Sequence, residues 1–115
     1  MEIFASDGKL RRALEDEKAR QKLLGTNMAK KLALRLTALA AADSLADFWP
    51  PKSGPERCHE LVGEMAGTFS IDLNQPFRLL FRPVEFSLPP DRSDELARWK
   101  CIKAIEIVAI KDTHE

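Results

Sequence analysis

Two hydrophobic periods divide this chain, and the division constrains its fold more than any other feature. In the N-terminal part, apolar residues recur every three or four positions, as in Met28, Leu32 and Leu36, which is the period of an amphipathic helix. Between Phe69 and Phe81, apolar and polar residues alternate, as in a strand with one buried face. The chain therefore combines helices with a sheet, and its predicted fold class is α+β.

The helical part is expected to follow a short strand. Glu2–Ala5 favours extended structure, and the side-chain oxygen of Ser6 or Asp7 can cap the helix that comes next. Gly25 can adopt the left-handed conformation that ends this helix, and Thr26 can cap a second one. Two helices joined by such a short break form an antiparallel hairpin.

The second half of the chain is expected to form most of the sheet. The alternating segments on either side of the turn Asn74–Pro76 indicate a β-hairpin. Ile102–Lys111 is apolar on both faces apart from Glu106, which suits a central strand. Two proline-rich segments, 49–55 and 83–95, are expected to be surface loops. The order β-α-α-β-β-β then packs an N-terminal strand and a two-helix hairpin on a small, mostly antiparallel sheet.

Length and composition fit a single globular domain over residues 1–115. Of the 115 residues, 44% are hydrophobic and 31% charged, which excludes a disordered or collagen-like protein. No apolar stretch reaches the roughly 20 residues that a membrane helix needs, and the N-terminus lacks the basic-then-apolar order of a signal peptide. A cytoplasmic protein without a membrane partner is expected, with Cys58 and Cys101 as free thiols.

The charges balance but are unevenly distributed. The chain has 18 Lys and Arg and 18 Asp and Glu. Residues 1–42 hold nine of the bases and five of the acids, a net charge of +4, whereas residues 43–115 hold nine and thirteen, a net charge of −4. A basic face on the helices agrees with this distribution, but bulk charge gives no signature of nucleic-acid binding.

Both histidines lie at the ends of expected strands and close to acids. His59 precedes Glu60, and His114 follows Asp112 by two residues. A histidine in such a place can act as a general acid or base, because its pKa lies near neutrality and a carboxylate can orient its ring. The alternative is two surface histidines with no chemical role.

Other patterns leave a structural and a functional interpretation open. Arg78 and Arg82 fall on one face of a strand, where their guanidinium groups either hold a phosphate or are simply solvated. The cysteines and histidines match no zinc-binding spacing, and the chain has no phosphate-binding glycine loop and no dinucleotide fingerprint. No metal and no other cofactor is therefore expected.

Three motifs, in order, resemble those of the HigB-type killer toxins of the RelE/ParE superfamily. The segment 59–71, HELVGEMAGTFSI, resembles the pattern His-x-Leu-x-Gly-x-x-x-Gly-x-x-Ser that leads into the hairpin of these toxins. The segment 77–81, FRLLF, resembles their aromatic-Arg-aliphatic strand, and 105–114 resembles their closing strand and Asp-Tyr-His tail. The resemblance extends over residues 1–115 and implies a RelE-like fold.

The resemblance implies a ribosome-dependent mRNA endoribonuclease that inhibits translation and is neutralised by a helix-turn-helix antitoxin. Such an enzyme needs no metal: a base activates the ribose 2′-OH, an acid protonates the leaving 5′ oxygen, and cations stabilise the charge on the phosphate. The catalytic candidates are His59, Arg78, Asp112 and His114, and the RNA-binding candidates beside them are Arg82, Lys111 and Thr113.

Three departures from the family's pattern keep a second hypothesis open. Thr113 stands where the family has a Tyr, Val62 where it has a Lys, and Met65 where it has an Arg or Lys. The loss of two cations near a phosphate site weakens RNA binding, which depends mainly on backbone phosphates. On this alternative, the chain is a binding module that has kept the fold, has lost catalysis and acts through a partner protein.

Overall fold

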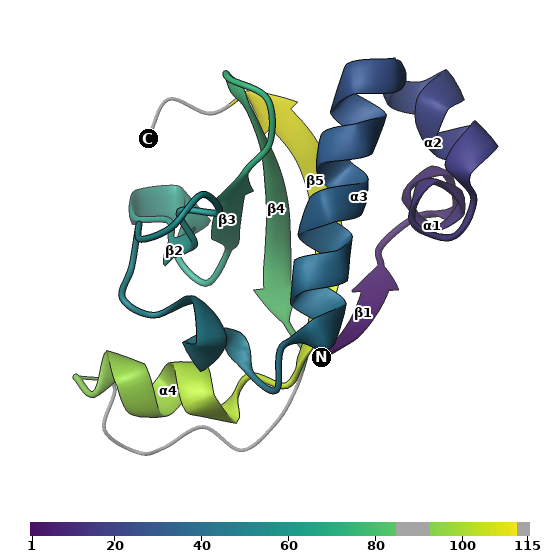
Figure 1. Cartoon of the computed structure of the whole chain (residues 1–115). Helices are drawn as coiled ribbons and strands as arrows, with labels where there is room; N and C mark the ends of the chain where they lie inside the picture. The colour runs from purple at the N-terminus through teal and green to yellow at the C-terminus, as the bar shows by residue number, and fades with distance from the viewer. Residues whose placement is uncertain (85–92, 113–115) are drawn as a thin grey trace.

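The protein is described by a computed structural model over residues 1–84 and 93–112 (Figure 1). Its strands are β1 (Glu2–Ala5), β2 (His59–Glu60), β3 (Phe69–Asp72), β4 (Phe77–Pro83) and β5 (Ala104–Asp112). Its helices are α1 (Gly8–Glu15), α2 (Glu17–Leu24), α3 (Thr26–Ala41) and α4 (Glu95–Cys101), with short 3-10 turns at Leu45–Phe48 and Gly63–Met65.

The strands form one mostly antiparallel sheet, which confirms the predicted α+β class. The strand order is β1-β5-β4-β3-β2, with β1 parallel to β5 and every other pair antiparallel. The predicted hairpin is present: Phe69 pairs with Phe81 and Ile71 with Leu79. Strand β5 has β1 on one side and β4 on the other, as expected for a segment that is apolar on both faces.

Helix α3 covers one face of the sheet and supplies the middle of the core. It runs in front of β5, with β4 at its side, whereas α1 lies beside β1 and α2 packs against α1 and α3 (Figure 1). Leu32 and Leu39 are fully buried and belong to one cluster with Ile71, Leu79 and Ile105. The helical period that predicted α3 is thus the period of its buried face.

The first predicted helix is divided into two helices at Asp16. The residue ends α1 and caps α2, where its side chain accepts a hydrogen bond from Ala19 N at 3.1 Å. Aspartate favours such caps over helix interiors, because its carboxylate competes for backbone N–H groups. The two-helix hairpin is therefore a series of three helices. Of the two residues predicted as the N-cap of α1, Ser6 or Asp7, it is Asp7 that caps it, with a hydrogen bond from Leu10 N at 2.8 Å.

The cap predicted at Thr26 is wrong. Gly25 occupies the N-cap position of α3, with φ at +80°, and no side chain caps this helix. Thr26 is the first residue of the helix itself. A single glycine thus makes the sharp turn between α2 and α3, in a conformation that other residues rarely adopt.

Helix α4 is an element that the sequence did not predict. Residues 83–95 were expected to form a loop; 85–92 lie outside the described residues, and α4 begins at Glu95. The helix buries Trp99, whose ring contacts Trp49 at 5.1 Å and Phe69 at 5.7 Å between centroids, both edge-to-face. Helix α4 therefore closes the core on the side of the sheet remote from α1 and α2 (Figure 1).

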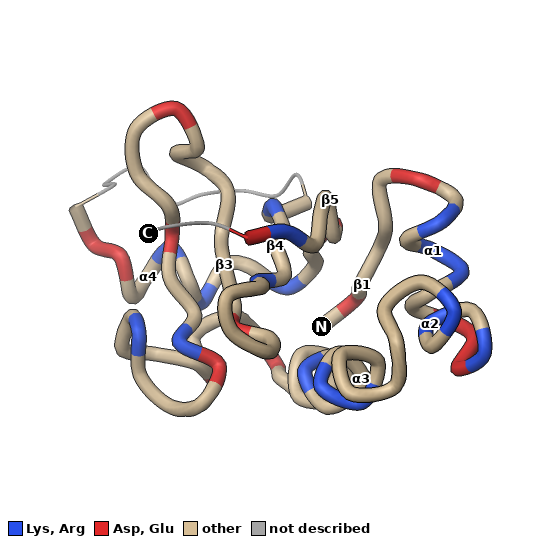
Figure 2. The backbone as a smooth tube through the Cα atoms, turned by 90° about the horizontal axis from the view of Figure 1, so that it is seen from above, with Lys and Arg blue, Asp and Glu red and all other residues tan. Residues whose placement is uncertain are grey.

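Basic residues gather on the helices. Lys and Arg follow one another along α1, α2 and α3 (Figure 2), which is where the sequence has its excess of positive charge. Within residues 1–84 and 93–112, none of the helices combines the length and apolar character needed to span a membrane.

Candidate active site

Arg78, the catalytic candidate of the hairpin, lies on the face of the sheet that points away from α3. Ile71 and Leu79 pack in the core with α3. Because side chains alternate along a strand, Ser70, Asp72 and Arg78 point to the other face. Asp72 and Arg78 are paired in register across β3 and β4, so their side chains lie next to each other.

Asp72 holds two arginines whose association no sequence pattern predicts. Its carboxylate lies 3.5 Å from Arg78 Nε and 3.6 Å from Arg57 Nε. The Asp72 and Arg78 side chains are only 9% and 12% exposed, whereas that of Arg57 is 52% exposed. Two guanidinium groups thus flank one nearly buried carboxylate and leave an excess of positive charge. Such a pair suits an anion of the size of a phosphate.

The backbone of Asp72 is fixed by hydrogen bonds to α3 and to the segment that precedes β2. Its carbonyl oxygen accepts a hydrogen bond from Arg35 Nε at 2.7 Å, and its N–H donates to Glu56 O at 2.8 Å. Arg35 also donates to Pro55 O at 3.2 Å. The uneven charge distribution predicts a basic face on the helices, but Arg35, the arginine of α3, is buried and ties the 49–57 segment to β3.

His59 is buried at the edge of the sheet, with one ring nitrogen already engaged. It pairs in register with Ser70, which precedes Asp72 by two residues on β3. Its Nδ1 lies 2.7 Å from the carbonyl oxygen of Arg57, which can only accept, so Nδ1 carries the hydrogen in the neutral ring. Nε2 then keeps a lone pair, and it is buried without a hydrogen-bond partner among the described residues. This tautomer suits a proton acceptor.

A small hollow leads to His59 from the end of the molecule that carries α4. It has a volume of about 260 Å³, and its lining includes His59, Glu60, Val62 and Trp99. Glu60 is held by an ion pair with Arg98 at 3.3 Å. Val62 is 73% exposed, so the family's lysine at this position would add a cation to the rim of the same hollow.

Of the two candidates on β5, Lys111 lies on the same face of the sheet as Arg78, whereas Asp112 is on the opposite face, and Arg82 lies farther along β4. Lys111 is opposite Arg78 in register, and Asp112 is opposite Phe77. Arg82 is paired with Glu106, four residues along β4 from Arg78, a separation of about 13 Å. An Arg78–Arg82 clamp on one phosphate stays a prediction, whereas Arg57 is the guanidinium group that shares the Asp72 carboxylate with Arg78. Thr113 and His114 lie outside the described residues.

The cysteines are free thiols, as predicted. Burial, assisted by the negative charge of Glu56, raises the pKa of the Cys58 thiol far above its usual value. Cys58 therefore stays protonated and is no nucleophile at neutral pH. In the part of the chain that the structure describes, no three His, Cys, Asp or Glu residues are grouped so as to hold a metal ion.

The solved structures to which this chain is similar include bacterial toxins. The chain is similar to the YoeB/ParE toxin from Agrobacterium tumefaciens, with 12% identity, a TM-score of 0.59 and coverage of 99% of this chain and 100% of the other. It is also similar to the YoeB–YefM complex and the YoeB dimer from Staphylococcus aureus. Their identities are 18% and 19% and their TM-scores 0.54 and 0.55, with coverage of 99% of this chain and 98% of each of theirs. These likenesses define the fold as that of the YoeB and ParE toxins.

The sequence identifies the family more narrowly. The family model for the HigB-like toxin, a RelE-like toxin of type II toxin–antitoxin systems, matches residues 2–88. The chain therefore belongs to the HigB-like family, whose toxins inhibit translation and are generally ribonucleases. None of the curated proteins matches its sequence. The matched segment contains His59, Arg78 and the departure at Val62.

Proposed function

We propose that this chain, as a single toxin domain over residues 1–115, cleaves mRNA on the translating ribosome without a metal ion. It acts in the cytoplasm, where its substrate is translated, and a helix-turn-helix antitoxin neutralises it. The observation that carries the proposal is the pair of arginines around Asp72, next to a histidine with a free lone pair. This arrangement offers the two functions that metal-independent RNA cleavage needs, anion binding and proton transfer.

Arg78 is proposed to bind the scissile phosphate. In this reaction the 2′ oxygen attacks phosphorus, the bond to the 5′ oxygen breaks, and negative charge accumulates on the non-bridging oxygens. A guanidinium group that is already held in place stabilises this charge without reorganising during the reaction. The ion pair with Asp72 fixes Arg78, and Lys111 on the neighbouring strand adds a second cation for the RNA backbone.

His59 and His114 are proposed to transfer the protons. The neutral His59 ring, with its hydrogen on Nδ1, can accept the proton of the 2′-OH at Nε2. His114 then protonates the leaving 5′ oxygen, and Asp112 orients it. Thr113 and Arg82 are proposed to contact the RNA outside the reacting phosphate.

His114→Ala is expected to abolish the mRNA cuts that the native chain makes during induced expression. Loss of a general acid costs about two to four orders of magnitude in rate. Cuts are mapped by primer extension on abundant transcripts, with Glu115→Ala as the matched control from the same tail. Cuts that persist in His114→Ala would contradict this role for the histidine.

One observation favours a second candidate function, a binding module that acts through its partner. His59 is only 6% exposed, and its Nε2 is buried, so a substrate reaches this atom only after a local movement. If neither the native chain nor His114→Ala produces cuts, although both are folded, the binding module is the better account.

A further inference from the structure

Arg57, in the segment that precedes β2, has a left-handed backbone. Its φ is +50°, a value that residues other than glycine, asparagine and aspartate seldom adopt. Its N–H donates to Ser53 O at 3.2 Å, and the neighbouring Glu56 O accepts a hydrogen bond from Asp72 N at 2.8 Å. The fold therefore holds Arg57 in a conformation that its side chain disfavours, and strained residues of this kind are concentrated at functional sites.

Arg57 contacts both parts of the candidate active site. Its carbonyl oxygen lies 2.7 Å from His59 Nδ1 and so fixes the tautomer in which Nε2 can accept a proton. Its guanidinium group lies 3.6 Å from the carboxylate of Asp72, which also holds Arg78 at 3.5 Å. One residue thus connects the proposed general base with the cation proposed for the scissile phosphate.

Asp72 offers a separate oxygen to each arginine. Its Oδ1 faces Arg78, and its Oδ2 faces Arg57. Oδ2 also accepts a hydrogen bond from Gln75 Nε2 at 3.3 Å. Arg57 can therefore leave the carboxylate while Oδ2 keeps a donor and Oδ1 continues to hold Arg78.

The two arginines differ in exposure, which separates their roles. The Arg78 side chain is 12% exposed, so it is held in one orientation. The Arg57 side chain is 52% exposed, so a ligand reaches it without displacing the protein around it. Ion pairs at exposed side chains contribute little, because water screens them. Arg57 can thus exchange the carboxylate for another anion.

We propose that Arg57 is a second phosphate-binding residue, which holds the phosphate next to the scissile one on a single RNA strand. The inference rests on the proposed function, in which Arg78 binds the scissile phosphate. Arg57 leaves Asp72 when the strand binds, and its planar fork takes the phosphate in the bidentate manner that guanidinium groups favour. The site is then built for a strand with two consecutive phosphates rather than for one isolated phosphate.

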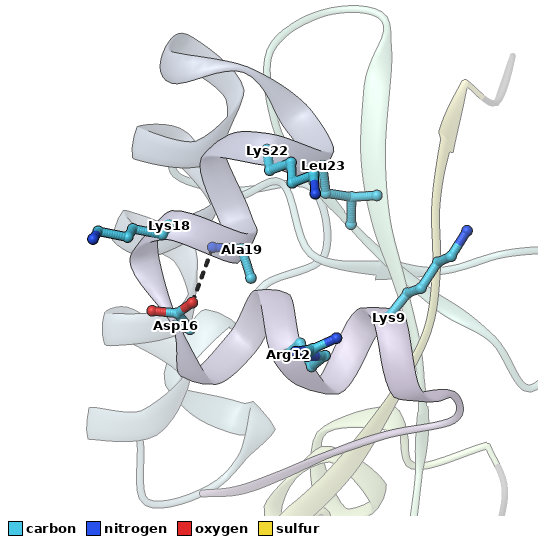
Figure 3. A pocket seen from close by; sticks show the side chains of 7 residues that line it. All are labelled: Lys9, Arg12, Asp16, Lys18, Ala19, Lys22 and Leu23. Carbon is cyan, nitrogen blue, oxygen red and sulfur yellow. Dashed lines mark hydrogen bonds between the residues drawn. The ribbon is translucent and has the colours of Figure 1, made fainter.

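A second basic cluster of the molecule lacks this organisation. Exposed cations line a hollow of about 510 Å³ between α1 and α2 (Figure 3): Lys9, Arg12, Lys18 and Lys22. Within residues 1–84 and 93–112, none of the four is in an ion pair that would fix its orientation. The hollow contains no catalytic candidate. These cations therefore supply a control for the general effect of positive charge.

Binding of a strand that cannot be cut tests the proposal on the full chain. The probe is a fluorescein-labelled 2′-deoxyuridine oligomer of about eight nucleotides, which has the phosphates but not the attacking 2′-OH. Fluorescence anisotropy is measured over a series of salt concentrations. The logarithm of the affinity falls linearly with the logarithm of the salt concentration, with a slope of about −0.7 for each phosphate that the protein neutralises. The slope therefore counts phosphate contacts.

Arg57→Asn is expected to remove one contact, which makes the slope shallower by about 0.7 and weakens binding about three- to tenfold at moderate salt. Asparagine tolerates the left-handed backbone, and the carbonyl oxygen that accepts from His59 is retained. Arg57→Lys keeps the charge and is expected to keep the slope, with a weaker affinity because the fork is lost. Circular dichroism verifies that the variants are folded.

Lys22→Ala is the matched control, because it removes one exposed cation from the cluster between α1 and α2. It is expected to leave the slope unchanged. An unchanged slope in Arg57→Asn, an equal change in Lys22→Ala, or a native chain that does not bind the oligomer would overturn the second phosphate site. Native protein that binds with the expected slopes but makes no cuts in mRNA would instead contradict the proposed function and leave Arg57 as a phosphate contact.

Discussion

Arg78→Ala is expected to lower mRNA cleavage by about two to three orders of magnitude while the protein stays folded. The guanidinium group of Arg78 is held 3.5 Å from Asp72 and only partly exposed, so it meets the phosphate in a fixed orientation. The variant removes the charge that stabilises the attacked phosphate, and no side chain on the same strand can replace it. Primer extension after induction, normalised to the amount of folded toxin, measures the loss.

Two further variants separate this role from a general effect of positive charge. Arg82→Ala removes an arginine of the same strand that is paired with Glu106, away from Asp72, and is expected to change cleavage less than tenfold. Arg78→Lys keeps the charge but loses the planar fork, so an intermediate rate is expected. Equal losses in Arg78→Ala and Arg82→Ala would show that the cluster around Asp72 has no special part in the reaction.

Trp99→Ala is expected to lower the free energy of unfolding by about 3–5 kcal/mol. The indole is 1% exposed and packs edge-to-face on Trp49 and Phe69, so its removal leaves a large cavity between α4 and the sheet. Domains of this size are stable by about 5–15 kcal/mol, so the variant loses a large part of its stability. Urea unfolding followed by circular dichroism measures the difference.

Leu34→Ala is the matched control for stability. Leu34 lies on the exposed side of α3, and its truncation is expected to change the free energy of unfolding by less than about 0.5 kcal/mol. A loss below about 1 kcal/mol in Trp99→Ala would mean that α4 does not close the core in solution.

The sequence predicted the elements whose local pattern agrees with their place in the fold. Alternation from Phe69 to Phe81 predicted the hairpin, because one face of it is buried against α3. Helix α3 has sixteen residues and a clear helical period, and it also formed as predicted. The apolar run of residues 102–111 predicted the closing strand β5. Strand β5 lies between β1 and β4, and a central strand of this kind is typically apolar on both faces.

The elements that were missed depend on contacts that no local pattern encodes. Helix α4 has seven residues, too few to show a period, and its stability comes from burying Trp99. The break at Asp16 was missed because the apolar stripe continues on both sides of it, although an aspartate between two helical segments is a typical cap.

The candidate site could be predicted only in part, and for the same reason. His59 and Arg78 were found because they belong to recognisable motifs. The alternating pattern predicts Asp72 only as one polar residue of a strand, and Arg57 belongs to no motif. Their association appears only when β3 and β4 pair and the segment before β2 folds back beside them. The one available signal was that Arg57 lies two residues before His59.

The chemical nature of the cut ends tests the central claim most directly. The purified toxin is mixed with ribosomes that carry a defined mRNA, and the products are separated and analysed by mass spectrometry. Attack by the 2′-OH leaves a 2′,3′-cyclic phosphate, or the 3′-phosphate formed from it, on one fragment and a 5′-OH on the other, and these ends are the predicted result. Fragments with a 3′-OH and a 5′-phosphate, or intact mRNA with a folded toxin, would contradict the account.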